Sequence, residues 1–119
     1  MPYVDGFVVP VPRKNLDAYR DMALKAGRIW IEHGATQFRE CMADDVKPGE
    51  LTSFPQSVML KDEEVVFFSW IVYESRARRD EVNDKVMKDP RMKDMMDSKN
   101  SPFDGKRMIF GGFEVLVDL

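Results

Sequence analysis

The spacing of hydrophobic residues changes from strand-like to helix-like near residue 12. Residues 3–11 form a β-branched and aromatic run bounded by Pro10 and Pro12, which is typical of a strand. After this run, apolar residues recur at alternating spacings of three and four, which predicts a long amphipathic helix. The apolar stripe consists of Leu16, Tyr19, Ala23, Ala26, Trp30 and His33. Gly34 follows, where a left-handed cap residue ends a helix at least cost.

The middle of the chain predicts two strands joined by a long connection. Residues 35–42 alternate imperfectly between apolar and polar, which favours a strand with one solvated face and a free edge. Residues 44–64 are too long for a hairpin turn, and residues 53–58 within them fit either a short strand or a single helical turn. Residues 65–73 form the most apolar strand of the sequence.

A second helical region follows the apolar strand. Residues 75–88 predict a helix supported by oppositely charged residues four positions apart. Asp89 and Pro90 then supply an N-cap and a first-turn proline for another helical segment. Residues 97–105 form a turn-rich loop that holds Phe103.

The final strand completes the order that defines the fold class. Residues 107–119 predict this strand, and Gly111 and Gly112 interrupt it, so we expect a β-bulge there. The resulting βαββαβ order predicts one α+β domain over residues 1–119, with a ferredoxin-like antiparallel sheet. In this topology the first and third strands, which are the most apolar, occupy the centre of the sheet.

Both faces of the predicted sheet are apolar. Right-handed crossovers place both helices on one face, so the other face of a monomer should be polar. The third strand instead alternates two apolar sets, Val65, Phe67, Ile71 and Tyr73 against Val66, Phe68, Trp70 and Val72. Because large apolar patches are rare on monomers, we expect a homodimer that packs sheet to sheet. The alternative is that long loops or the C-terminal residues cover this face.

The overall composition is that of a soluble globular protein. A net charge of −3 over 119 residues argues against a general polyanion binder. No apolar run approaches the roughly 20 residues of a membrane span, and the N-terminal residues do not resemble a secretory signal, so we expect a cytoplasmic protein. Cys41 is the only cysteine, which excludes an internal disulfide and a cysteine-based metal site.

His33 is the only histidine and the first candidate for acid–base chemistry. Its place in the last turn of a helix has a structural explanation as well, because the helix dipole favours a histidine there. The nearest carboxylates, Glu32 and Glu40, do not have the spacing of a metal motif. We therefore predict neither a metal site nor a cofactor.

Two further groups of residues are candidates for ligand binding. Arg76, Arg78 and Arg79 open the second predicted helix, where they either pair with neighbouring carboxylates or bind an anion. Aromatic residues are expected to line an apolar pocket for a small molecule, with Phe103 as a lid. These residues are Trp30, Trp70, Tyr73, Phe103 and Phe110.

Residues 68–73 also have the aromatic spacing of the third-strand motif of RNA-recognition domains. The motif requires a basic residue and a glycine where this chain has Val66 and Phe67. This difference and the acidic net charge argue against RNA binding.

Four segments together resemble the DUF1428 family, YbaA-like bacterial proteins of unknown function. They are residues 53–56 (SFPQ), 65–73 (VVFFSWIVY), 89–92 (DPRM) and 102–113 (PFDGKRMIFGGF), and the last is the most specific. The resemblance covers nearly the whole chain. It implies a dimeric α/β-barrel of ferredoxin-like subunits, a group that also holds small cofactor-free monooxygenases and chlorite dismutase relatives. It brings no established catalytic residues.

These observations predict a cytoplasmic homodimer that binds a small molecule in a pocket between sheet and helices. The enzyme alternative is a cofactor-independent monooxygenase or isomerase of the dimeric barrel type. In that alternative, His33 or an arginine polarises the substrate, and Trp30 or Trp70 stacks on it. The sequence alone names neither the ligand nor a reaction.

Overall fold

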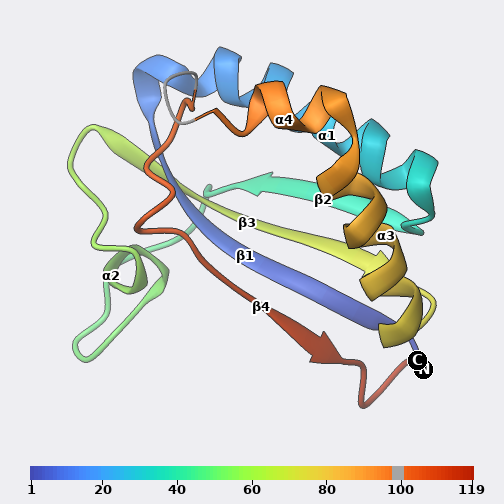
Figure 1. Cartoon of the computed structure of the whole chain (residues 1–119). Coiled ribbons are helices and arrows are strands. Elements are labelled where there is room, and N and C mark those ends of the chain that lie inside the picture. The colour runs from blue at the N-terminus through green and yellow to red at the C-terminus, as the bar shows by residue number, and fades with distance from the viewer. Residues whose placement is uncertain (98–100) are drawn as a thin grey trace.

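A four-stranded antiparallel sheet carries helices on one face in the computed structural model, which describes residues 1–97 and 101–119 (Figure 1). The strands are β1 (Tyr3–Pro12), β2 (Gln37–Met42), β3 (Glu64–Tyr73) and β4 (Ile109–Glu114), in the spatial order β2-β3-β1-β4. The helices over this face are α1 (Leu16–His33), which follows the short η1 (Arg13–Asn15), then α3 (Arg76–Lys88) and α4 (Pro90–Met95). This order confirms the predicted α+β ferredoxin-like fold with β1 and β3 at its centre.

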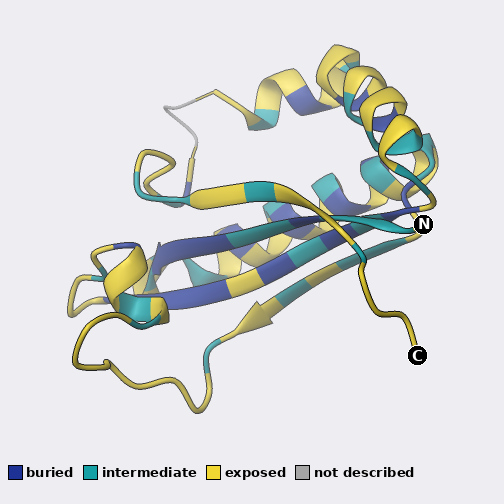
Figure 2. Cartoon of the chain, turned by 90° about the horizontal axis from the view of Figure 1, so that it is seen from below, coloured by how far each residue is buried: buried dark blue, intermediate teal, exposed yellow. Residues whose placement is uncertain are grey.

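The two central strands carry the hydrophobic core. They pair along their full lengths, from Tyr3 opposite Tyr73 to Pro12 opposite Glu64. Alternate residues point to opposite faces of the sheet, and most of the helix-facing set is buried. It forms two clusters, one of Ile71 and Tyr73 with α3, and one of Val9, Val11, Val65 and Phe67 with α1. Figure 2 shows the central strands mainly buried or intermediate, β2 intermediate to exposed and β4 largely exposed.

The helix-end signals predicted at Gly34 and Asp89 are confirmed, and the structure adds a cap at Ser75. Gly34 ends α1 with a φ of 123°, a conformation that favours glycine. The Ser75 side chain accepts from the backbone N–H of Arg78 at the start of α3, and Asp89 does the same for Arg91 at the start of α4. None of the described helices is both long enough and apolar enough to span a bilayer.

The long connection between β2 and β3 contains α2 (Phe54–Ser57). Of the two alternatives predicted for residues 53–58, the helical turn is therefore confirmed. This connection packs beneath one end of the sheet, on the side away from the helices (Figure 1). There Val58 is buried against Val8 and Val66. Loop residues therefore cover one end of that side and leave the rest of it uncovered.

The prediction of a β-bulge at the two glycines is wrong. Gly111 and Gly112 pair with Gly6 and Asp5 in an uninterrupted register. A Cβ on Gly112 would lie 2.5 Å from the Tyr3 hydroxyl and 2.9 Å from an Arg79 nitrogen, so this glycine permits a close approach instead.

The last strand is also shorter than predicted and covers residues 109–114 instead of 107–119. Arg107 lies before the strand, and its guanidinium pairs with the buried Glu64 carboxylate, with Nη2 and Oε2 2.6 Å apart. Beyond the strand, Leu116, Val117 and Leu119 are exposed.

Candidate ligand-binding site

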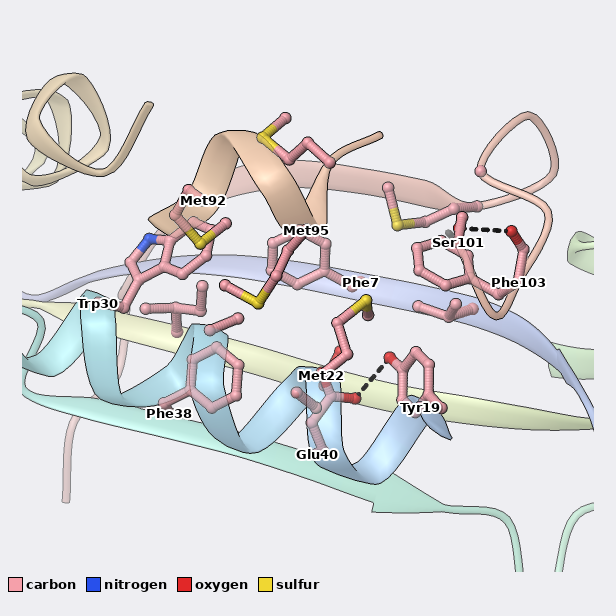
Figure 3. Close-up of a pocket in the computed structure, with 18 of the residues that line it drawn as sticks. Phe7, Tyr19, Met22, Trp30, Phe38, Glu40, Met92, Met95, Ser101 and Phe103 are labelled. Carbon is pink, nitrogen blue, oxygen red and sulfur yellow. Dashed lines mark hydrogen bonds between the residues drawn. The ribbon is translucent and has the colours of Figure 1, made fainter. Parts of the chain in front are cut away.

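A cavity of about 570 Å³ lies between the helices and the helix-facing side of the sheet. Helix α1 lines one side of it, and α4 with residues 101–108 lines another (Figure 3). Its aromatic lining consists of Phe7, Tyr19, Trp30, Phe38, Trp70 and Phe103. This volume lies within the range of about 300–1,000 Å³ that is usual for small-molecule pockets.

Methionine is the commonest residue of the cavity wall. Six of the nine methionines of the chain line it: Met22, Met87, Met92, Met95, Met96 and Met108. In Figure 3, Met22 from α1 and Met92 and Met95 from α4 extend into the space between the two helices. Because an unbranched thioether is flexible and polarisable, such a wall can adjust its shape to an apolar molecule.

One hydrogen-bonded polar pair interrupts the apolar wall. The Tyr19 hydroxyl donates to Oε1 of Glu40 over 2.9 Å (Figure 3). Glu40 lies on β2 opposite Ser69 of β3. Burial raises the pKa of Glu40, and hydrogen bonds from Tyr19 and Ser69 counter part of this rise. Burial and the charge of Glu40 raise the pKa of Tyr19, so its hydroxyl keeps its proton and acts as the donor.

A second polar network fixes the orientation of Trp30 at one end of the cavity. Its indole N–H donates to Oδ1 of Asn83 at 3.0 Å. The buried Tyr73 hydroxyl donates to Oδ2 of Asp5 at 2.9 Å, and Arg79 donates to both oxygens of the same carboxylate. The network therefore ties α1, α3 and the centre of the sheet together behind the cavity.

The predicted aromatic residues divide between the cavity and other places. Trp30 and Phe103 line the cavity, and Phe103 packs edge-on against Tyr19 with ring centres 5.6 Å apart. Trp70 borders it as well, but its strand position places it on the opposite side of the sheet, next to Phe68. Tyr73 lies in the buried network described above, and Phe110 is exposed on β4.

The predicted histidine and arginines do not line the cavity. Nε2 of His33 lies 2.9 Å from Oδ2 of Asp89, which connects the end of α1 to the start of α4. Arg79 is bound to Asp5, and Arg78 donates to Glu81 at 2.9 Å. Arg76 is exposed on α3. These contacts favour the structural explanation for His33, Arg78 and Arg79.

Sequence reasoning missed Glu40 and the methionines as site residues. The signal for Glu40 was its place between Phe38 and Met42 on β2, where alternation puts a charged residue on the helix-facing side. Methionine has no spacing motif that separates a cavity wall from a core. Only the fold reveals that residues 22, 92, 95 and 108 face one space.

The donors around the cavity suit an organic molecule better than a metal ion. Within residues 1–97 and 101–119, no three histidine, cysteine, aspartate or glutamate side chains are grouped so that they could hold a metal ion. The lining combines a large apolar surface with the partly buried carboxylate of Glu40.

The side of the sheet away from the helices is also apolar, and we call its uncovered part the open face. It consists of Val4, Phe68, Trp70, Val72, Ile109 and Phe113. Phe113 is 62% exposed, and Phe68 is 45% exposed although Phe54 of α2 packs edge-on against it. The two apolar sets predicted for β3 are therefore confirmed, one under the helices and one toward this face.

The strand order and the helices on one face of the sheet define a ferredoxin-like α+β fold. A Nitrosomonas europaea protein named as a candidate antibiotic biosynthesis monooxygenase has a similar structure, with a TM-score of 0.62 and 12% identity, over 97% of this chain and 90% of the other. A dimeric ferredoxin-like protein from an uncultured marine organism matches with a TM-score of 0.58 and 12% identity, over 100% of both chains. At this identity the likeness shows the fold alone.

The chain belongs to the DUF1428 family, proteins of unknown function whose model matches residues 2–105. It is 52% identical over 118 residues to the uncharacterized protein YbaA of Escherichia coli strain K12, an alignment that covers 99% of each chain. The YbaA of Shigella flexneri matches with the same identity and coverage. The family resemblance of the sequence segments is thereby confirmed.

Proposed function

We propose that this protein is a homodimer that binds a small, largely apolar organic molecule in the cavity between sheet and helices. The observation that carries the proposal is the cavity wall, in which methionine and aromatic side chains surround about 570 Å³. Burying an apolar molecule there removes apolar surface of both the ligand and the wall from water. This burial stabilises the complex by roughly 25 cal/mol for each Å² of apolar surface. Hydrogen bonds fix the orientation of two side chains in this wall, Trp30 and Tyr19.

Binding of the neutral fluorophore N-phenyl-1-naphthylamine tests this proposal. We expect saturable fluorescence enhancement with the wild-type protein, and binding weakened by about tenfold or more in Ala26→Phe, because the new ring occupies the cavity. Lys25→Phe places the same ring on the exposed side of α1 and should bind like wild type. Non-saturable binding, or equal binding by Ala26→Phe and wild type, would contradict the proposal.

The open face supports the dimeric part of the proposal. Its aromatic residues are too exposed for a stable monomer surface, and a second copy can cover them by packing sheet to sheet. The chain also exposes 8223 Å², whereas a compact monomer of its 13.8 kDa is expected to expose about 6,600 Å². The excess exceeds the roughly 800 Å² per partner that a standard interface buries.

Size-exclusion chromatography with light scattering tests the dimer. The expected mass is twice 13.8 kDa at micromolar concentration, and Phe113→Asp should yield folded monomer because it places a charge on the open face. Asp118→Ala provides a control outside that face. A wild-type mass of 13.8 kDa would contradict this part of the proposal. Dimerisation would also bury Phe68 and Trp70, which removes them as base-stacking residues for RNA.

The second candidate function is a cofactor-independent monooxygenase or isomerase. The specific observation in its favour is that the Glu40 carboxyl lines the cavity and has a raised pKa, as a general base or acid requires. The name of the Nitrosomonas europaea structural neighbour points in the same direction. His33 and Arg79 fit a catalytic role less well because each is bonded to an aspartate.

Incubation of the protein with a bacterial metabolite extract separates binding from catalysis. Mass spectrometry of the molecules that co-purify identifies a ligand, and a second incubation of that ligand with fresh protein follows its fate. Recovery of the unchanged ligand supports a binding protein. A product that disappears with Glu40→Gln supports the enzyme.

A further inference from the structure

We propose that Glu40 makes the cavity selective for uncharged apolar molecules that carry a hydroxyl or N–H group, and that it rejects carboxylates. This inference rests on the proposed function, because it names the chemical class that the same cavity takes. It follows from the position of Glu40, from its hydrogen-bond partners and from the lack of an ion pair to it among residues 1–97 and 101–119.

Glu40 differs from the other charged residues that border the cavity. Arg39, Asp104 and Lys106 are exposed, whereas Glu40 is partly buried between α1 and the sheet. Arg39 is the strand neighbour of Glu40 and so points to the other face of β2. Asp104 is bound to Arg107 at the rim. Among the described lining residues, Glu40 is therefore the charged group within reach of a molecule inside the cavity.

The partners of Glu40 are hydroxyl groups. Tyr19 donates to Oε1 at 2.9 Å, and Ser69 is the second hydroxyl that stabilises the carboxylate. None of the ion pairs found among residues 1–97 and 101–119 includes Glu40. A carboxylate has about four acceptor positions, so two hydroxyls leave room for another donor. A ligand hydroxyl or N–H can take that place.

The same geometry disfavours an anionic ligand. A ligand carboxylate in the cavity would lie close to the Glu40 carboxylate with mainly methionine and aromatic side chains around both. Two such groups cannot both remain ionised in apolar surroundings without a large cost, and among the described residues no ion pair to Glu40 offsets that cost. A donor, by contrast, gains a charge-assisted hydrogen bond. One residue thus provides both an attractive and a repulsive element of specificity.

Three molecules with one ring system test the inference: 2-naphthol, naphthalene and 2-naphthoate, each measured by displacement of N-phenyl-1-naphthylamine. For the wild-type protein we expect 2-naphthol to bind about tenfold more tightly than naphthalene, and 2-naphthoate to bind most weakly. If naphthalene and the fluorophore fail to bind at all, the proposed function itself fails. If they bind and 2-naphthoate binds as tightly as 2-naphthol, only the present inference fails.

The variant Glu40→Gln assigns the selectivity to the carboxylate. This variant keeps an oxygen that can accept from Tyr19 and removes the charge. The affinity for 2-naphthoate should therefore rise about tenfold, while the affinity for naphthalene stays unchanged. Tyr19→Phe keeps the carboxylate, and should keep the preference for 2-naphthol over 2-naphthoate. An unchanged ratio of these two ligands in Glu40→Gln would overturn the inference. The wild-type ratio tests it independently of whether either variant folds.

Discussion

Arg79 of α3 holds the buried Asp5 of β1 through both carboxylate oxygens, with Nη2 and Oδ1 2.9 Å apart. The carboxylate also accepts from the Tyr73 hydroxyl. Asp5 is 6% exposed. The cation that pairs with its carboxylate at the centre of the sheet comes from a residue 74 positions further along the chain. This ion pair fixes α3, and through Asn83 it fixes the indole of Trp30.

We predict that Arg79→Met destabilises the protein by about 3–5 kcal/mol, because it leaves the Asp5 charge buried without its cation. The double variant Asp5→Asn with Arg79→Met should recover a large part of this loss. Urea unfolding followed by circular dichroism measures both free energies. Losses that simply add in the double variant would show that the two side chains are not coupled.

Gly112→Ala and Gly111→Ala should have different effects although the two glycines are neighbours. A Cβ on Gly112 meets the Tyr3 hydroxyl and Arg79, so we expect a loss of about 1–3 kcal/mol. A Cβ on Gly111 meets only the Phe113 ring at 3.6 Å or more, which is ordinary contact, and alanine there should be neutral or slightly stabilising. Thermal unfolding of the two variants makes the comparison. Equal effects would contradict the uninterrupted register of β4.

The hydrogen bonds of Asp89 predict a loss of stability in acid. Arg91 first and His33 second hold the pKa of the Asp89 carboxyl well below its usual range. Because this pKa is lower in the folded chain, the stabilisation is complete above the unfolded value of about 3.9 and decreases as the pH falls below it. Asp89→Asn should therefore show a smaller decrease in unfolding free energy between pH 5 and pH 3 than wild type.

Asp84→Asn is the control for this measurement because it removes a carboxylate from the exposed pair with Lys88. It should follow the wild-type pH profile closely. If Asp89→Asn and Asp84→Asn have the same profile, the contacts between Asp89, His33 and Arg91 do not stabilise the fold.

For Glu40 we predict the opposite pH dependence of the unfolding free energy. Burial raises its pKa in the folded chain, so ionisation of Glu40 near neutral pH costs folding free energy. Glu40→Gln should be more stable than wild type at pH 7, and the difference should shrink as the pH falls toward the unfolded value of about 4.3. Melting temperatures across this range measure it. A variant that is less stable than wild type at pH 7 would show that the carboxylate is structural rather than functional.

Most of the fold is predictable from the sequence because the signals are local. Each signal depends on a few neighbouring residues: the change of hydrophobic period near residue 12, Gly34 at the end of α1, and Asp89 with Pro90 at the start of α4. The extent of β4 is not predictable in this way. The contacts around it join residues far apart in the sequence: Arg107 pairs with Glu64 just before the strand, and Tyr3 and Arg79 occupy the space beside Gly112 within it.

The candidate site is less predictable because its residues meet only through the tertiary structure. Trp30 and Phe103 could be chosen from the sequence as aromatic residues, and both line the cavity. His33 had the right chemistry, but its partner Asp89 lies 56 positions away and holds it outside the cavity. Glu40 was visible only as a nearby carboxylate. Its importance depends on the burial that α1 provides.

Methionine methyl groups offer the most direct test of the cavity as the ligand site. In protein labelled with ¹³C at these methyl groups, titration with N-phenyl-1-naphthylamine should shift the resonances of cavity residues such as Met22, Met92 and Met95. Met1, Met42 and Met59 lie outside the cavity, and their resonances should stay in place. Shifts confined to these three, or equal shifts throughout, would contradict the account.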